Sequence, residues 1–124
     1  MSTIRVDNFG PSAGGTTYSA RGIAKAWVNF DGTGTIAARD SENVSSLTDN
    51  GTGNYTVNFS SSMDNANYSC VVSGGEGSGT PSEVDVRAPT GSTFSTSNFQ
   101  MRSSNGSALI DAQYLFANTH GDLA

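Results

Sequence analysis

This chain of 124 residues has only one cysteine and one histidine, and the lack of further copies of these residues argues against several kinds of bond and site. Cys70 has no partner for an intramolecular disulfide, and one Cys with one His cannot supply the three or four ligands of a zinc site. No serine or cysteine nucleophile in a recognisable local motif accompanies His120, so the sequence gives little support for a Ser/His/Asp or Cys/His mechanism. We therefore expect a protein that is not an enzyme and that holds no metal and no cofactor.

Basic residues are also few, six against eleven acidic ones, and the net charge is −5. They are scattered along the chain, at Arg5, Arg21, Lys25, Arg39, Arg87 and Arg102. No basic patch for a phosphate backbone is visible, so we expect no nucleic-acid partner. No apolar run approaches the roughly 18 residues of a membrane span, and the first residues lack the pattern of a signal peptide. We expect no membrane insertion and no export signal.

What the chain does have is glycine, serine, threonine and asparagine in abundance, the composition of short strands joined by tight turns. From residue 24 to 30, Ala and Val alternate with Lys and Asn, and Trp27 is the one large apolar residue on the polar side. The turn Asp-Gly-Thr-Gly at 31–34 then predicts a hairpin with residues 35–39. A second turn at 49–53 predicts another hairpin and leads into the clearest strand, in which Tyr55, Val57 and Phe59 share one face.

The same alternation continues to the end of the chain. It places Tyr68, Cys70 and Val72 on one face of a further strand and predicts others at 83–88 and 98–102. Residues 112–117 carry apolar groups on both faces, which indicates a central strand or one in an interface. Seven or eight such strands predict an all-β fold, an antiparallel β-sandwich or jelly roll, although periodicity does not fix the strand order.

The N-terminal segment differs from the rest of the chain, because residues 9–17 are dense in glycine and carry a proline. Such a composition argues against a packed element. We therefore expect two parts: an extended N-terminal arm at 1–22 and a β-sandwich domain at 23–124.

Two kinds of binding group stay open as alternatives. Loop carboxylates, at Asp31, Asp40, Glu42, Asp49 and Asp64, could ligate calcium or act in glycoside hydrolysis, but Asp before Gly is what tight turns require, and no calcium-binding spacing or catalytic pair is recognisable. Aromatic side chains, at Tyr18, Trp27, Tyr55, Tyr68 and Tyr114, could stack on a sugar ring, but aromatics alternating in strands are more often core. Only Trp27 is out of phase with the apolar face of its strand, and burial against a neighbouring subunit explains it equally well.

Three segments together carry a resemblance to a known family. They are Ala-Trp-Val-Asn-Phe within residues 24–41, Asp-Asn-Gly-Thr-Gly-Asn-Tyr-Thr-Val-Asn-Phe within residues 43–59, and Met-Asp-Asn-Ala-Asn-Tyr at 63–68. About half the chain thereby resembles a domain of tail fibres and related virion structural proteins of tailed bacteriophages, marine phages especially. The resemblance implies a β-rich, trimeric appendage module in the virion, made in the host cytoplasm without a signal peptide, and it brings no enzymatic residues. The opening Met-Ser-Thr-Ile-Arg-Val-Asp at 1–7 is also similar to the openings of such proteins, which implies that the arm at 1–22 attaches to the virion or contacts another subunit.

The sequence therefore favours a non-enzymatic phage virion structural protein, a homotrimeric tail-fibre-like module anchored to other virion proteins by its N-terminal arm, with loops that could touch a glycan on the host surface. The alternatives are a capsid-decorating (cement or head-fibre) protein and a stand-alone carbohydrate-binding module. The expected interface residues are Ile4, Val6, Phe9, Trp27, Tyr114, Leu115 and Phe116.

Overall fold

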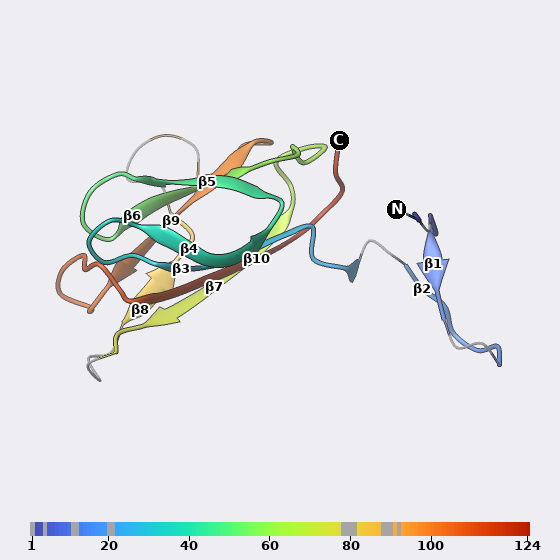
Figure 1. Cartoon of the computed structure of the whole chain (residues 1–124), viewed down its shortest axis with the longest axis horizontal. Helices are drawn as coiled ribbons and strands as arrows, with labels where there is room; N and C mark the ends of the chain where they lie inside the picture. The colour runs from blue at the N-terminus through green and yellow to red at the C-terminus, as the bar shows by residue number, and fades with distance from the viewer. Residues whose placement is uncertain are drawn as a thin grey trace.

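The computed structural model describes residues 2–3, 5–10, 13–19, 22–77, 82–87, 91 and 93–124. Two four-stranded antiparallel sheets pack face to face (Figure 1). One has the order β4-β3-β10-β7, formed by Ala37–Glu42, Ala26–Asp31, Tyr114–His120 and Ser69–Gly75; the other has the order β5-β6-β9-β8, formed by Val44–Asp49, Asn54–Phe59, Asn98–Ser104 and Glu83–Asp85. No α-helix occurs in the described ranges. The predicted antiparallel β-sandwich is confirmed.

The core lies between the sheets and is built by period-two alternation. In β3, Ala26, Val28 and Phe30 are buried, and in β6 the side chains of Tyr55 and Phe59 are buried in the same way. Phe30 meets Tyr55 edge to face across the sandwich, with ring centroids 5.3 Å apart, a geometry that aromatic pairs prefer. Burying these large side chains provides most of the driving force for closing the two sheets.

Both predicted hairpins form. β3 pairs with β4 around the turn at 31–34, where Gly34 has a φ of 59°. β5 pairs with β6 around the turn at 49–53, where Gly51 and Gly53 have φ values of 104° and 66°. Positive φ is strained for residues with a Cβ, which explains why glycine occupies these turns.

The chain passes from one sheet to the other at Asn43, the single residue between β4 and β5, whose φ is 54°. Its side chain holds the crossing in place: Oδ1 accepts the Ser61 backbone N–H at 2.7 Å, and Nδ2 donates to the Ser61 carbonyl at 3.1 Å. β4 and β5 are thus consecutive in sequence and lie at the same open side of the sandwich, each at the edge of its sheet.

The N-terminal residues form a separate small element. β1 (Asn8–Phe9) pairs antiparallel with β2 (Tyr18–Ser19) in a two-stranded sheet of its own, which stands apart from the sandwich in Figure 1. The segment expected to be an extended arm therefore folds back on itself over these residues. Val6 and Phe9 expose about half of their side chains, 54% and 48%.

Candidate functional site

The outer surface of the β4-β3-β10-β7 sheet carries large apolar side chains. Trp27 of β3 and Phe116 of β10 are half-buried on this surface, whereas Tyr114 of β10 and Val71 of β7 are exposed, at 42% and 62%. Because neighbouring residues in each of these strands point into the core, these four side chains face away from it. We call this surface, defined by Trp27, Val71, Tyr114 and Phe116, the aromatic face.

Strand register brings these side chains together. Trp27 lies directly opposite Asn118, and Asn29 lies directly opposite Phe116, so the two rings occupy diagonal positions on adjacent strands. Diagonal partners across antiparallel strands lie within reach of aromatic side chains. On the far side of β10, Val71 also lies opposite Asn118. The result is a sheet surface in which apolar groups alternate with the amides of Asn29 and Asn118.

The outer surface of the other sheet has a different chemistry. Its outward positions are occupied by polar and charged residues: Ser46, Thr48, Glu83, Asp85, Asn54, Thr56, Asn58, Asn98, Gln100, Arg102 and Ser104. Several of these pair with one another: Asn58 Nδ2 donates to Thr48 Oγ1 at 3.0 Å, and Arg102 Nε donates to Asp85 Oδ1 at 2.8 Å. Since one sheet face is wholly polar at these positions, the rings on the opposite face are not explained by the general composition of the chain.

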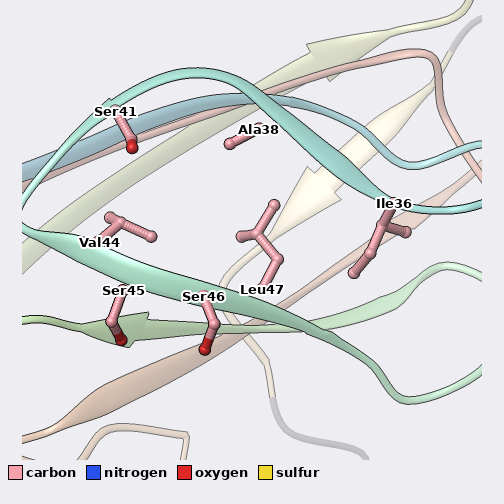
Figure 2. Close-up of a pocket in the computed structure, with 7 residues that line it drawn as sticks. All are labelled: Ile36, Ala38, Ser41, Val44, Ser45, Ser46 and Leu47. Atoms are coloured by element: carbon pink, nitrogen blue, oxygen red, sulfur yellow. The ribbon is translucent and has the colours of Figure 1, made fainter.

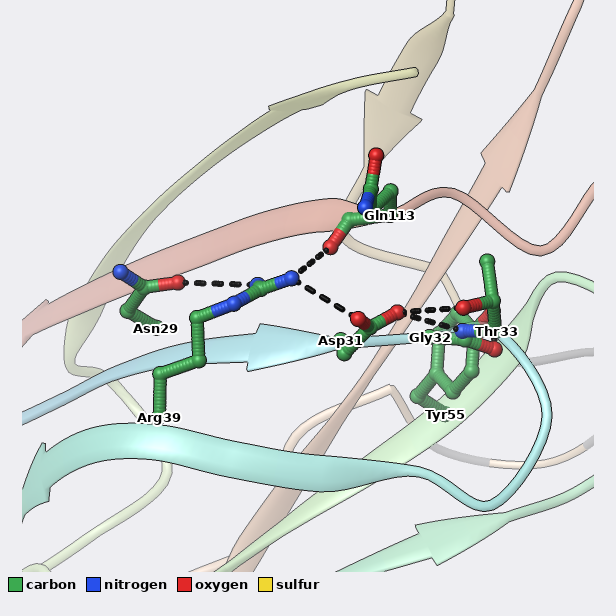
Figure 3. A network of polar contacts seen from close by, with 7 residues as sticks. All are labelled: Asn29, Asp31, Gly32, Thr33, Arg39, Tyr55 and Gln113. Atoms are coloured by element: carbon green, nitrogen blue, oxygen red, sulfur yellow. Dashed lines mark hydrogen bonds and ion pairs between the residues drawn. The ribbon is translucent and has the colours of Figure 1, made fainter. Parts of the chain in front are cut away.

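Arg39 lies at one end of the aromatic face, and Figure 3 shows its polar contacts with Asn29, Asp31 and Gln113. Its Nη2 donates to the Asp31 carboxylate at 2.9 Å and to the Gln113 backbone carbonyl at 2.7 Å, and its Cζ lies 4.9 Å from the ring centroid of Tyr114. A longer contact, 3.4 Å, joins Nη1 to Asn29 Oδ1. This arrangement links β4, β3 and β10 and orders the guanidinium beside the ring.

Asp31 has a second set of partners within its own turn. Its Oδ1 accepts the hydroxyl of Thr33 at 2.6 Å and the backbone N–H of Thr33 at 3.0 Å. These hydrogen bonds, followed by the charge of Arg39, lower the pKa of the Asp31 carboxyl below its usual value. Asp31 therefore carries its negative charge over an extended acidic range and acts as a turn residue, as its position before glycine predicted.

A groove of about 290 Å³ opens between the edge strands β4 and β5 (Figure 2). Its lining consists of aliphatic side chains and serine hydroxyls: Ile36, Ala38, Ser41, Val44, Ser45, Ser46 and Leu47. Among these described lining residues there is no carboxylate, imidazole or thiol, so the groove offers no general acid, base or ready nucleophile. The pairing of each flanking strand with its neighbour is irregular at one point. The register of the β3–β4 pair shifts between Asn29 and Phe30, and the register of the β5–β6 pair shifts between Val44 and Ser46.

The expected interface residues fall into three groups. Trp27, Tyr114 and Phe116 lie on the aromatic face. Val6 and Phe9 lie in the N-terminal hairpin region, and Ile4 lies outside the described residues. Leu115 is a correction: it is fully buried in the core, at 0% exposure, because it points inward between Tyr114 and Phe116. The strand is apolar on both faces as predicted, but only its outward residues are available to a partner.

The remaining candidate side chains, which are the cysteine and the loop carboxylates, do not form a shared site in the described part of the chain. Burial raises the pKa of the Cys70 thiol to about 11, which keeps it protonated at neutral pH, as a small buried hydrophobe would be. Asp49 accepts the Gly51 N–H at 2.8 Å, and Asp40 accepts the Ser41 N–H at 2.9 Å, so both serve their local backbone. Within the described part of the chain, no three His, Cys, Asp or Glu side chains are grouped so that they could hold a metal ion.

Sequence patterns do not single out two residues of the site. By pattern, Arg39 is one of six scattered basic residues, and Asn29 is a polar member of its strand. Their roles depend on Gln113 and Phe116, which lie far away in sequence. A local pattern carries no signal for such contacts.

Comparison with known proteins adds no further assignment: no family model, curated protein or solved structure matches the chain. Among the described residues, no helix has the length and hydropathy needed to cross a membrane.

Proposed function

We propose that this chain is a non-enzymatic structural protein of a tailed-phage virion, which assembles as a homotrimer through the aromatic face and attaches to other virion proteins through residues 1–22. The single observation that carries the assembly is the difference between the two outer faces of the sandwich. One presents Trp27, Val71, Tyr114 and Phe116, while the other presents hydroxyl, amide and charged groups. Aromatic side chains are enriched at the centres of protein interfaces, where they bury large areas.

The phage part of the proposal is supported by the resemblance of residues 24–41, 43–59 and 63–68. These segments cover all but one residue of the two hairpins β3–β4 and β5–β6, and they extend into the connection that follows β6, so the resembling residues include the structural unit around the β4–β5 crossing. Electron microscopy of particles that contain the protein would distinguish a tail location from a capsid location. Absence of the chain from purified virions would refute the virion role.

Assembly is tested by sedimentation velocity at micromolar concentrations with matched variants. Phe116→Ser removes a ring from the aromatic face, and Gln100→Ser changes a residue at an equivalent, outward position on the polar face. The proposal expects trimers for the unchanged protein and Gln100→Ser, and a shift towards monomers for Phe116→Ser. Circular dichroism checks that both variants keep the fold. A strictly monomeric unchanged protein, or a trimer unaffected by Phe116→Ser, would overturn assembly through this face.

Carbohydrate binding is a second candidate function for the same face. It is favoured by the amides of Asn29 and Asn118, which lie opposite Phe116 and Trp27 and could hydrogen-bond sugar hydroxyls while a ring stacks on the sugar. A glycan array with the unchanged protein and Trp27→Ala tests this candidate. Binding lost in the variant supports it, and absence of signal on the array, or equal binding by both proteins, removes it.

A further inference from the structure

The sequence contains two Asn-Gly pairs, Asn50-Gly51 and Asn105-Gly106, and the two pairs have different hydrogen-bond partners in the fold. In an Asn-Gly pair, the backbone nitrogen of glycine can attack the side-chain amide carbon of asparagine, because glycine has no Cβ to hinder the approach. We infer that Asn105 is a site of spontaneous deamidation in the folded protein, whereas Asn50 is protected. Both residues are exposed, so access to water does not separate them.

The nucleophile is freer at position 106. The Gly51 N–H donates to the Asp49 carboxylate at 2.8 Å, and a hydrogen bond to a carboxylate opposes loss of that proton. Among the described residues, the Gly106 N–H makes only a long contact, 3.4 Å to Ser104 Oγ. Deprotonation of the attacking nitrogen is therefore less hindered at Gly106.

The side-chain amide that the nitrogen attacks is better activated in Asn105 than in Asn50. Asn105 Oδ1 accepts the backbone N–H groups of Ser107 at 3.0 Å and Ala108 at 2.9 Å. Two fixed N–H donors on the oxygen that becomes negatively charged resemble the oxyanion holes of acyl-transfer sites. Asn50 has no such donors in the described structure, and its Nδ2, the leaving group, is held by Thr56 Oγ1 at 2.8 Å.

The reaction balances without any further reagent except water. A solvent base removes the Gly106 amide proton, the nitrogen bonds to Asn105 Cγ, and the negative charge moves to Oδ1. The protonated base then returns the proton to Nδ2, and when the carbonyl re-forms, the Cγ–Nδ2 bond breaks and Nδ2 leaves as ammonia, which gives a succinimide. Water then opens the ring at either carbonyl and leaves an aspartate or an isoaspartate at position 105. The new carboxylate lies in the loop between β9 and β10, near Glu83, whose Oε1 is 3.8 Å from the position a Cβ would take on Gly106.

The test is incubation of the folded protein at mildly alkaline pH, followed by trypsin and mass spectrometry. Cleavage after arginine places Asn105 in the peptide 103–124 and Asn50 in the peptide 40–87, so fragment spectra locate the replacement of NH2 by OH separately at each site. We expect Asn105 to react at least about tenfold faster than Asn50, since one oxyanion donor alone can be worth more than that. The rate should rise with pH.

Two controls separate the fold from the local sequence. In urea, where both sites are unfolded, the two rates should become similar, and Asp49→Ala should speed the reaction at Asn50 in the folded protein by freeing the Gly51 N–H. Asn105→Gln should abolish the fast mass change in peptide 103–124. Equal rates in the folded protein, a faster reaction at Asn50, or a rate ratio unchanged by urea would overturn the inference.

Discussion

The guanidinium of Arg39 lies over the ring of Tyr114, with Cζ 4.9 Å from the ring centroid, while the same group is paired with Asp31 and Gln113. The two residues come from β4 and β10, strands that are separated by β3. This contact reaches across the central strand and orders one end of the aromatic face. It also makes Arg39 the residue whose replacement should affect both stability and the shape of that face.

Replacing Arg39 with alanine should lower the free energy of unfolding by about 1 to 2 kcal/mol, because the ion pair, a hydrogen bond to a backbone carbonyl and the ring contact are lost together. Urea titration followed by fluorescence of the single tryptophan measures the change. Arg102→Ala is the matched control: Arg102 also forms an ion pair, with Asp85 at 2.8 Å, but on the polar face and with a more exposed carboxylate. We expect Arg102→Ala to lower the free energy of unfolding by less than about 0.5 kcal/mol. Equal losses in the two variants would contradict the distinct role of Arg39.

Stability should fall at acid pH partly through Asp31. Its pKa is lowered in the folded state, so the charged carboxylate stabilises the fold above the usual pKa of an aspartate, and this contribution disappears as the pH falls through the lowered value. Asp31→Asn should therefore be less stable than the unchanged protein near neutrality, with the difference narrowing below about pH 4. Urea titrations at a series of pH values give the comparison. A difference that is independent of pH would rule out a role for the charge.

Tyr55→Phe should destabilise the sandwich by about 1 to 2 kcal/mol, because it removes a buried hydroxyl that contacts Asp111 Oδ1 at 3.0 Å and the Gly32 carbonyl at 3.2 Å. Burial also raises the pKa of Tyr55, so its hydroxyl stays protonated and can donate throughout the accessible pH range. Tyr114→Phe is the control, since no hydrogen bond of its exposed hydroxyl occurs within the described residues. Denaturant titration should show almost no change for the control.

Gly53→Ala should be much more damaging than Gly34→Ala, although both glycines have a positive φ, 66° and 59°. A Cβ on Gly53 would lie 2.5 Å from the Ser103 carbonyl oxygen, whereas a Cβ on Gly34 meets nothing within 4 Å. Backbone strain of roughly 1 kcal/mol is expected for both, with a further 1 to 3 kcal/mol of crowding at Gly53. Thermal unfolding followed by circular dichroism measures both variants. Similar melting temperatures would show that the space around Gly53 adapts.

The thiol of Cys70 should react slowly with a disulfide reagent at neutral pH, because burial raises its pKa to about 11 and the thiolate is the reactive form. Unfolding in urea should speed the reaction. A Ser73→Cys variant in a Cys70→Ser background places a thiol on the exposed side of the same strand and should react quickly in the folded protein. Fast labelling of native Cys70 would contradict the assigned burial.

Local patterns were sufficient for the turns at 31–34 and 49–53 and for most strands of the sandwich, but they did not predict the short pair β1 and β2. Alternation at 26–30 and 55–59 and the glycine turns after Asp31 and Asp49 predicted two hairpins, and both are present. The reason is that side-chain direction in a strand has a fixed period of two, and positive φ selects glycine. The same reasoning marked Trp27 as the residue out of phase with the apolar side of its strand, and it lies on the outer face.

Only the tertiary structure decided which apolar residues meet solvent and which distant residues meet each other. Residues 112–117 are apolar on both sides, so their alternation could not choose between Leu115 and Phe116 for the core; the packing of one face of the β4-β3-β10-β7 sheet against the other sheet made that choice. Likewise, Arg39 reaches Gln113 across 74 positions of sequence and Tyr55 reaches Asp111 across 56. Such contacts depend on which strands lie next to one another, and the alternation of side chains along a single strand carries no information about its neighbours. The sequence by itself therefore determined most strands of the sandwich and the turns of its hairpins, and the packing of the two sheets determined the aromatic face.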